Sequence, residues 1–389
     1  MRFGHFGCWN NMNGNLEDNM NFIKDSTERD DIDFFSVAGD NYYPKKGDKK
    51  EEKKEKTIFE KDLRQGFDLL PMKQTDKFMI LGNHDLETDL QYVDDDEKER
   101  GTERECKILK LEQEIANKSP DIFLNLFKFY FDSKTRTLLI FFDTTMYVDE
   151  NFEKFQKCYE RIIPGNIVGK NTSKSKDKSN MVYQEALIEY QNQAIKDYIS
   201  RRGKITNLVL IGHHPLIYLK RKKGKEIFKQ DIPKVSGLLG HIHDLCPDSK
   251  FFYLCADLHL YQGGDVEFSH GDKTMKIKQY IVGTGGTDLD DDIAGEPPPK
   301  TIGAFKYTHK ETIRSHGFLL CDFTGDKEPT LTFKHNSFIT PPKKRSTSSA
   351  ISPRKKSVAN PRSSTRSITP TKGGRLMRQK RKGTRKRKN

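Results

Sequence analysis

Four short segments carry side chains that could bind metal ions or transfer protons. They are Gly39-Asp40-Asn41, Gly82-Asn83-His84, Gly212-His213-His214 and Ala256-Asp257-Leu258-His259. Carboxylates, imidazoles and amide oxygens are ligands for zinc, manganese and iron. A carboxylate at Asp40 could bridge two cations at the spacing of about 3.5 to 4 Å that is typical of two-metal sites. In the pair Asn83-His84, one side chain could bind metal and the other could give or take a proton.

The elements that position these residues follow from short apolar runs, most of which end in a polar side chain. We predict strands at residues 2–6, 34–38, 77–81, 138–142, 207–211, 251–255 and 279–282. Segments of helical character separate these runs, and this alternation is typical of a layered α/β domain. In open α/β sheets ligands collect outside the carboxyl ends of strands. The four segments are therefore expected to share one crevice.

The serial motifs resemble those of a known family. Gly-Asp-Asn-Tyr-Tyr-Pro at 39–44, Gly-Asn-His-Asp at 82–85, Gly-His-His-Pro at 212–215 and Cys-Ala-Asp-Leu-His at 255–259 are similar to the blocks of calcineurin-like metallophosphoesterases. They are most similar to those of purple acid phosphatases. Phe-Asp-Thr at 142–144 resembles the end of that family's central strand, and residues 280–286 resemble its closing strand and glycine turn. The resemblance covers about residues 2–335 and implies an α/β fold with a layered β-sandwich core flanked by helices.

The resemblance also implies a role for each motif residue. Asp40 would bridge both metals, and Tyr43 and His259 would bind the first, which is ferric iron in the family. The second metal would be held by Asn83 and His213, and His84 would donate a proton to the leaving alkoxide. Two cations could clamp a phosphate ester, acidify a water molecule and stabilise the charge of an in-line attack. The expected substrate is thus a phosphoester.

Two blocks depart from the family pattern. Gly4-His5-Phe6-Gly7 stands where the family has Gly-Asp-Trp-Gly, which places His5 at a carboxylate position. In the last block, Asp257 stands at a histidine position. We expect both to act as ligands, so that an Asp and a His are exchanged between the two metals. An imidazole beside Tyr43 lowers the negative charge there and favours divalent zinc or manganese over ferric iron.

A rival for the last block spells the family motif literally in Gly240-His241-Ile242-His243. Its apolar residues fall at helical spacing, and the run before it is less strand-like than residues 251–255. We therefore prefer Asp257 and His259 as the ligands and expect the literal motif on a helix.

Charge divides the chain into two predicted regions. Of the 69 Lys and Arg, 18 lie in residues 341–389 without any Asp or Glu, and residues 1–340 are mildly acidic. We predict one metallophosphoesterase domain at 1–340 and a disordered basic tail at 341–389. The tail could act as a nuclear localisation signal or bind nucleic acid and other polyanions without sequence preference. Three charged segments at 45–56, 94–107 and 169–180 are expected to be exposed loops or frayed helix ends.

The six cysteines lack metal-knuckle or disulfide-framework spacing, so reduced thiols are expected. With no apolar run of about 18 residues and no leader-like N-terminus, a soluble intracellular protein is predicted. Two other function classes stay open beside the enzyme: a degenerate phosphatase fold without turnover, and a nucleic-acid-associated protein tethered by its basic tail.

Overall fold

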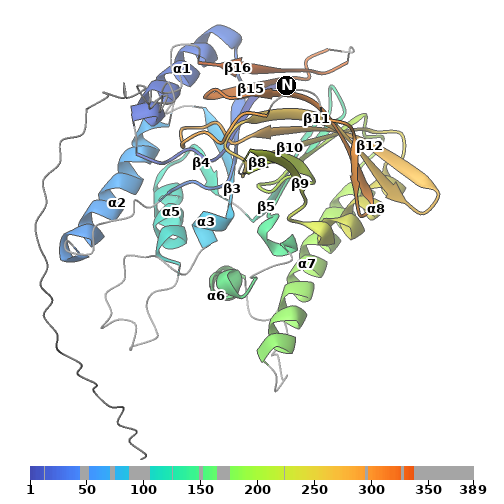
Figure 1. Ribbon diagram of the computed structural model, residues 1–389, viewed down its shortest axis with the longest axis horizontal. Helices are drawn as coiled ribbons and strands as arrows, with labels where there is room; N and C mark the ends of the chain where they lie inside the picture. Colours follow the sequence, from blue (N-terminus) through green and yellow to red (C-terminus); the bar gives the residue numbers. More distant parts are fainter. Residues whose placement is uncertain are drawn as a thin grey trace, which may run out of the picture. The chain divides into compact units, whose positions relative to one another are not determined.

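The short apolar runs of the sequence form strands of sheets that other layers of the fold cover, and this covering buries their apolar side chains. The computed structural model describes residues 1–12, 14–43, 52–70, 75–86, 106–124, 126–148, 152–163, 176–222, 224–293, 297–325 and 328–336. In these ranges two large sheets form the centre of the fold, and helices flank them (Figure 1). This arrangement confirms the predicted α/β fold with a layered sheet core.

The six-stranded sheet has the order β16-β15-β1-β2-β3-β4. Its strands are β1 (Arg2–Phe6), β2 (Phe34–Ala38), β3 (Asp76–Ile80), β4 (Ile122–Leu124), β15 (Gly317–Asp322) and β16 (Thr330–His335). The eight-stranded sheet has the order β13-β14-β11-β12-β10-β7-β6-β5. Its strands are β5 (Phe127–Asp132), β6 (Thr137–Phe142), β7 (Asn207–Ile211), β10 (Lys250–Cys255), β11 (Tyr261–His270), β12 (Lys273–Val282), β13 (Lys300–Ile302) and β14 (Phe305–Ile313). A separate hairpin pairs β8 (Tyr218–Lys222) with β9 (Lys225–Lys229).

The central strands are buried on both faces. On β6, Leu139 and Phe141 belong to a core shared with the six-stranded sheet, whereas Leu138 and Ile140 belong to a second core together with Leu187 of α7. Parallel strands covered on both sides read as continuous apolar runs. This burial explains why the runs at 138–142 and 207–211 were recognisable as strands in the sequence.

Helices cover the outer faces of the sheets. They are α1 (Gly14–Asp30), α2 (Glu52–Leu69), α3 (Asn83–Leu86), α5 (Lys107–Lys118), α6 (Glu153–Ile162), α7 (Lys176–Ser200) and α8 (Ser236–Leu245). Two short 3-10 turns lie at η1 (Thr145–Tyr147) and η2 (Pro233–Val235). In Figure 1, α1 and α2 lie on one side of the sheets and α7 and α8 on the other.

The seven predicted strands are present, with ends within a residue or two except that β12 begins earlier. The described parts of the three charged segments lie at the starts of α2, α5 and α7. Their other residues, the predicted domain boundary at 340 and the basic tail lie outside the described residues. No helix in the described ranges is long and apolar enough to cross a membrane.

The expectation of reduced cysteines is wrong for one pair. Cys106, at the start of α5, forms a disulfide with Cys158 of α6, and their Cα atoms are 5.5 Å apart. The two residues are 52 positions apart in the sequence, so no local sequence pattern indicates that they pair. The four remaining cysteines are free and buried, namely Cys8, Cys246, Cys255 and Cys321.

Because this disulfide closes a long loop, Cys158→Ser is expected to lower the free energy of unfolding. The chain-entropy treatment gives a loss of up to about 4 kcal/mol for a loop of roughly fifty residues. Urea denaturation with and without a reductant measures it. The native chain should fall to the level of the variant when reductant is added, whereas the control Cys246→Ser should retain a reductant-sensitive midpoint. A native midpoint that ignores reductant would show that the bond does not form in solution.

Candidate metal centre

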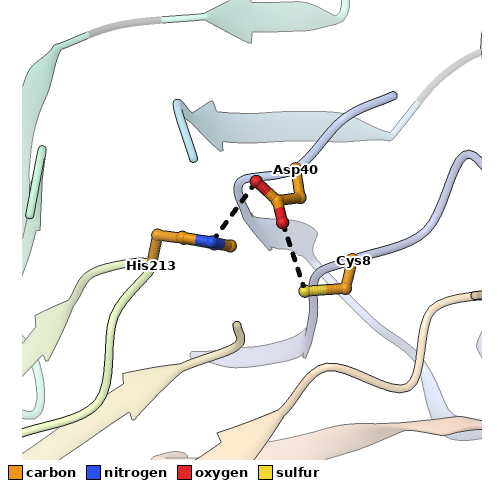
Figure 2. Close-up of side chains that lie close together, drawn as sticks. All are labelled: Cys8, Asp40 and His213. Carbon is orange, nitrogen blue, oxygen red and sulfur yellow. Dashed lines mark hydrogen bonds and ion pairs between the residues drawn. The ribbon is translucent and has the colours of Figure 1, made fainter. Parts of the chain in front are cut away.

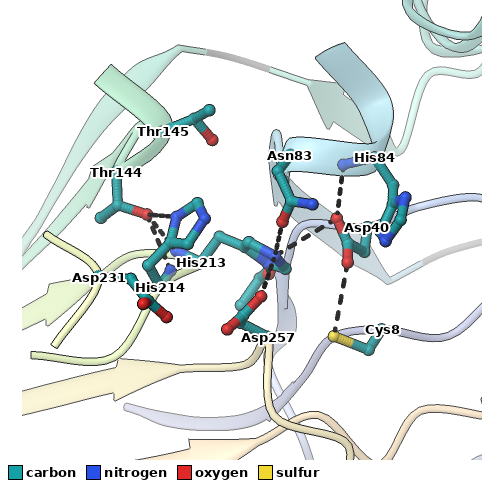
Figure 3. Close-up of polar contacts among 12 residues, drawn as sticks. Cys8, Asp40, Asn83, His84, Thr144, Thr145, His213, His214, Asp231 and Asp257 are labelled. Atoms are coloured by element: carbon teal, nitrogen blue, oxygen red, sulfur yellow. Dashed lines mark hydrogen bonds and ion pairs between the residues drawn. The ribbon is translucent and has the colours of Figure 1, made fainter. Parts of the chain in front are cut away.

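The carboxyl ends of parallel strands bring the candidate ligands together. Strands β1, β2 and β3 are parallel neighbours in one sheet, and β6, β7 and β10 are parallel neighbours in the other. The segments that follow five of these strands carry Cys8, Asp40, Asn83, His213 and Asp257, which lie around one point in Figure 3. The predicted convergence of strand ends is therefore present.

Asp40 lies at the centre of this group and is buried. Its backbone has φ 51°, in the left-handed region that Asp tolerates better than most residues, and Gly39 before it has φ 77°. A Cβ at Gly82 would lie 2.3 Å from Asp40 Oδ1 and 2.4 Å from its backbone nitrogen. Only a glycine at position 82 therefore lets the loops after β2 and β3 pack this closely.

One oxygen of Asp40 faces a first donor set, defined here as Cys8, Tyr43 and His259. Tyr43 donates its hydroxyl hydrogen to Asp40 Oδ2 at 2.6 Å, and the same hydroxyl lies 3.1 Å from His259 Nε2. The Cys8 thiol donates to Oδ2 across 4.0 Å (Figure 2). A thiol, a phenol and an imidazole thus meet at one side of the carboxylate.

The other oxygen of Asp40 faces a second donor set, defined as Asn83, His213 and Asp257. His213 Nε2 lies 3.3 Å from Asp40 Oδ1, 3.1 Å from Asn83 Oδ1 and 3.7 Å from Asp257 Oδ1. The two sets are on different oxygens of one carboxylate. This is the arrangement that a bridging ligand requires.

Charge and hydrogen bonding keep Asp40 ionised. Burial opposes ionisation, but the charges of His213 and His84 and the hydrogen bonds to the carboxylate hold the pKa of Asp40 far below its usual range. Burial likewise lowers the pKa of His213, yet the charge of Asp40 outweighs it and raises that pKa to about 10. Without metal, the pair is a carboxylate and an imidazolium.

The ring of His213 is fixed by contacts on its other nitrogen. Its Nδ1 lies 2.6 Å from the backbone carbonyl of Ala38, which can only accept a hydrogen, so Nδ1 is the donor. This contact leaves Nε2 directed at the carboxylates, as is common for histidine ligands of metals. Thr144 Oγ1 accepts the backbone N–H groups of His213 and His214, and so fixes the loop after β7.

His84 touches the centre in two ways. Its backbone N–H donates to Asp40 Oδ1 at 3.0 Å. Its imidazole lies against the ring of Tyr43, with ring centroids 4.9 Å apart, and the residue is partly exposed. This hydrogen bond to Asp40 is therefore independent of the His84 side chain, whereas the charge of the imidazole acts on the pKa of Asp40.

The structure does not bring His5 to this centre. His5 is fully buried within β1, with Nδ1 3.0 Å from Ser36 Oγ and Nε2 3.3 Å from the carbonyl oxygen of Cys255. Both ring nitrogens are thus used in the core between the sheets, and burial lowers the pKa of His5 to about 4. Cys8, three residues later, has its sulfur 4.0 Å from Asp40 Oδ2.

Sequence reasoning missed Cys8 because it aligned the family's Gly-Asp-Trp-Gly with residues 4–7. The strand runs to Phe6, so the first side chains beyond its end belong to Gly7-Cys8-Trp9. The position of the strand end relative to the glycine was the signal that could have found Cys8.

The rival motif lies on a helix, as its spacing predicts. His241 and His243 belong to α8, where His241 is exposed and shares a surface hollow with Gln193 and Asp197 of α7. His243 packs on the ring of Phe251, with centroids 6.2 Å apart. Neither belongs to the candidate metal-binding groups found among the described residues.

The donor atoms fit metal ions. Ligand atoms of Cys8, Asp40 and His213 lie within 4.8 Å of one another, as do those of His213, His214 and Asp257. Ligands around a zinc ion stand about 2.0 to 2.3 Å from the metal, so small shifts would close either group on a cation. The mixed set of thiol, imidazole and carboxylate suits a transition metal better than magnesium or calcium.

Two buried carboxyl groups, those of Asp85 and Glu112, lie near Asp40. Asp85 accepts hydrogen bonds from the backbone N–H groups of Asn41 and Gly82, and burial together with the charge of Asp40 raises its pKa to about 7. Glu112 of α5 is fully buried, and its carboxyl group lies next to that of Asp85. Burial and the charge of Asp85 raise the pKa of Glu112 well above its ordinary value.

This raised pKa predicts a pH effect on stability. Above the ordinary glutamate pKa of about 4.5, the unfolded chain releases a proton that folded Glu112 keeps, so the free energy of unfolding falls as pH rises. Glu112→Gln cannot titrate and should be more stable than the native chain at neutral pH, with a smaller fall between about pH 4 and 8. Denaturation midpoints across this range test it. Glu114→Gln, exposed on the same helix, should keep the native pH slope.

Comparison with known proteins identifies the domain. The model of the family described as calcineurin-like phosphoesterase matches residues 1–245, more than half of the chain. The chain belongs to this family. Membership of this family supports the assignment of the chain as a metal-dependent phosphoesterase, which is a hydrolase. The matched span ends at the end of α8, so it includes His241 and His243 and stops before Asp257 and His259. The choice between the two blocks rests on the geometry around Asp40.

Several solved structures are similar to this chain at low sequence identity. A Plasmodium protein, GAP50, described as the anchor in the inner membrane complex, is 12% identical with a TM-score of 0.49, covering 86% of this chain and 84% of its own. A dimetal phosphatase from Danio rerio is 9% identical with a TM-score of 0.44, covering 86% and 96%. The protein TT1561 of Thermus thermophilus is 10% identical with a TM-score of 0.35, covering 86% and 98%. No curated protein matches the sequence.

Proposed function

We propose that this chain hydrolyses phosphate esters at a binuclear metal centre of the purple acid phosphatase type, with Asp40 as the bridging ligand. One observation carries the proposal: the two oxygens of Asp40 face two different donor sets, one through Tyr43 and Cys8 and the other through His213. The order of the sequence motifs supports the narrower family assignment.

Different residues of the chain would hold the two metal ions. Tyr43 and His259 would hold a first metal ion, and Asn83, His213 and Asp257 a second. When bound, divalent ions such as zinc, manganese or iron supply positive charge that lowers the pKa of a water molecule and offsets the charge of the phosphoryl group. The Ala38 carbonyl orients His213 by accepting from Nδ1, which keeps Nε2 available.

His84 is the proposed proton donor to the leaving alkoxide. The residue is partly exposed and its ring lies against Tyr43, so an ester oxygen could approach it. A positioned histidine of this kind can act as a general acid near neutral pH.

The proposal predicts metal-dependent turnover. The full chain, depleted of metal by a chelator, should hydrolyse neither aryl phosphate monoesters nor aryl phosphate diesters, and zinc or manganese should restore hydrolysis of at least one. Steady-state assays with metal analysis of each sample measure this. Two bound metals with no hydrolysis of any ester would contradict the proposal and favour a phosphatase fold that has lost turnover.

A further inference from the structure

Cys8 is held where a ligand of the first metal would stand. The turn after β1 gives Cys8 a φ of 53°, its N–H donates to the carbonyl of Gly39 at 3.1 Å, and the N–H of Trp9 donates to the carbonyl of Asp40 at 3.4 Å. On the other side, the N–H of Gly7 donates to the carbonyl of Val282 at 3.0 Å. Backbone contacts to both sheets therefore fix the backbone of Cys8, from which the thiol reaches Asp40.

The surroundings of Cys8 differ from those of two other buried free cysteines. Cys255 and Cys321 lie within strands, and their thiols donate to backbone carbonyls at 3.6 and 3.9 Å. The sulfur of Cys8 contacts the carboxylate of Asp40 and forms a candidate metal group with Asp40 and His213 (Figure 2). A cysteine that only filled space would not need a carboxylate and an imidazole beside it.

We propose that Cys8 is a thiolate ligand of the metal ion on the Oδ2 side of Asp40, and that it makes this position selective for zinc over manganese and ferric iron. The inference rests on the proposed metal centre and specifies its metal. Thiolate is a soft ligand that favours zinc, whereas carboxylate suits manganese. One thiolate carries the same charge as the carboxylate that the resemblance places in the first block.

The step that creates this ligand is a proton release. In the metal-free chain, the Cys8 thiol carries a hydrogen and donates it to Asp40 Oδ2. On binding, the S–H bond breaks, its electron pair forms the bond from sulfur to the metal, and the proton leaves to solvent. Coordination makes this favourable because a bound cation deprotonates a thiol outright.

Cobalt(II) alone, added to the metal-free full chain, serves as the probe, because thiolate ligation of cobalt gives a charge-transfer band in the near ultraviolet. We expect this band in the native chain, its loss in Cys8→Ser, and its retention in Cys321→Ser, which removes a buried thiol away from Asp40. Proton release measured in weakly buffered solution should fall in Cys8→Ser. Cys8→Asp should bind cobalt without the band and compete less well for zinc against manganese than the native chain.

Two results would overturn the inference. Cobalt bound without the band, or a band that survives in Cys8→Ser, would refute thiolate ligation by Cys8 without contradicting the proposed binuclear centre. An absence of bound metal in the native chain and in every variant would instead refute the centre itself, and the thiolate with it. If Cys8→Ser does not fold, Cys8→Asp decides, because a band in that variant cannot come from position 8.

Discussion

Asp40→Asn is expected to lose both metal ions and, with them, hydrolysis. The substitution removes the negative charge shared by the two donor sets and replaces one carboxylate oxygen by an amide nitrogen, which cannot bind a cation. Backbone strain should not contribute, because asparagine also tolerates the left-handed φ of 51° at this position. Metal content after gel filtration and the rate on aryl phosphates measure the loss.

Asp31→Asn is the matched control for this variant. Asp31 has the same φ of 51° but is exposed at the end of α1, away from the metal donors. It should keep native metal content and rate. Two metals retained by Asp40→Asn would contradict a bridging carboxylate.

The second large effect is expected for His84→Ala, which should keep its metals and lose rate. The contact between His84 and Asp40 is made by the backbone N–H, which alanine preserves. The imidazole that alanine removes is the proposed proton donor, and general acid catalysis is typically worth about 10²- to 10⁴-fold. Values of kcat for esters with poor leaving groups should fall most, since these need the proton most.

His241→Ala on α8 controls for the loss of a histidine from a helix of the same domain. Its ring is exposed and shares a hollow with α7, so both metal content and kcat should remain native. Loss of metal from His84→Ala would show that His84 is a ligand. An unchanged kcat in His84→Ala would show that His84 takes no part in catalysis.

Local patterns in the sequence predicted which strand ends converge around Asp40. The proximity of Asp40, Asn83 and His213 could be predicted because each follows a strand that is buried on both faces, which leaves a continuous apolar run before it. The structure also brings Tyr43 and Asp257 to the same point. Strand ends of known direction suffice to predict such a convergence.

Other features depend on register and tertiary contact. A shift of three residues in the first block exchanged His5, which hydrogen-bonds within the core, for Cys8, which faces Asp40. The Cys106–Cys158 disulfide joins two helices that no local pattern pairs. Glu112 is one acidic residue in a charged helix, and only packing shows that it is buried beside Asp85.

Anomalous scattering from crystals of the zinc-loaded full chain tests the binuclear centre most directly. We predict two peaks roughly 3.5 to 4 Å apart on either side of the Asp40 carboxylate, one near Tyr43 and His259 and the other near Asn83 and His213. A single peak would contradict a binuclear centre. Peaks at His241 and His243 on α8, with none at Asp40, would overturn the assignment of the ligands altogether.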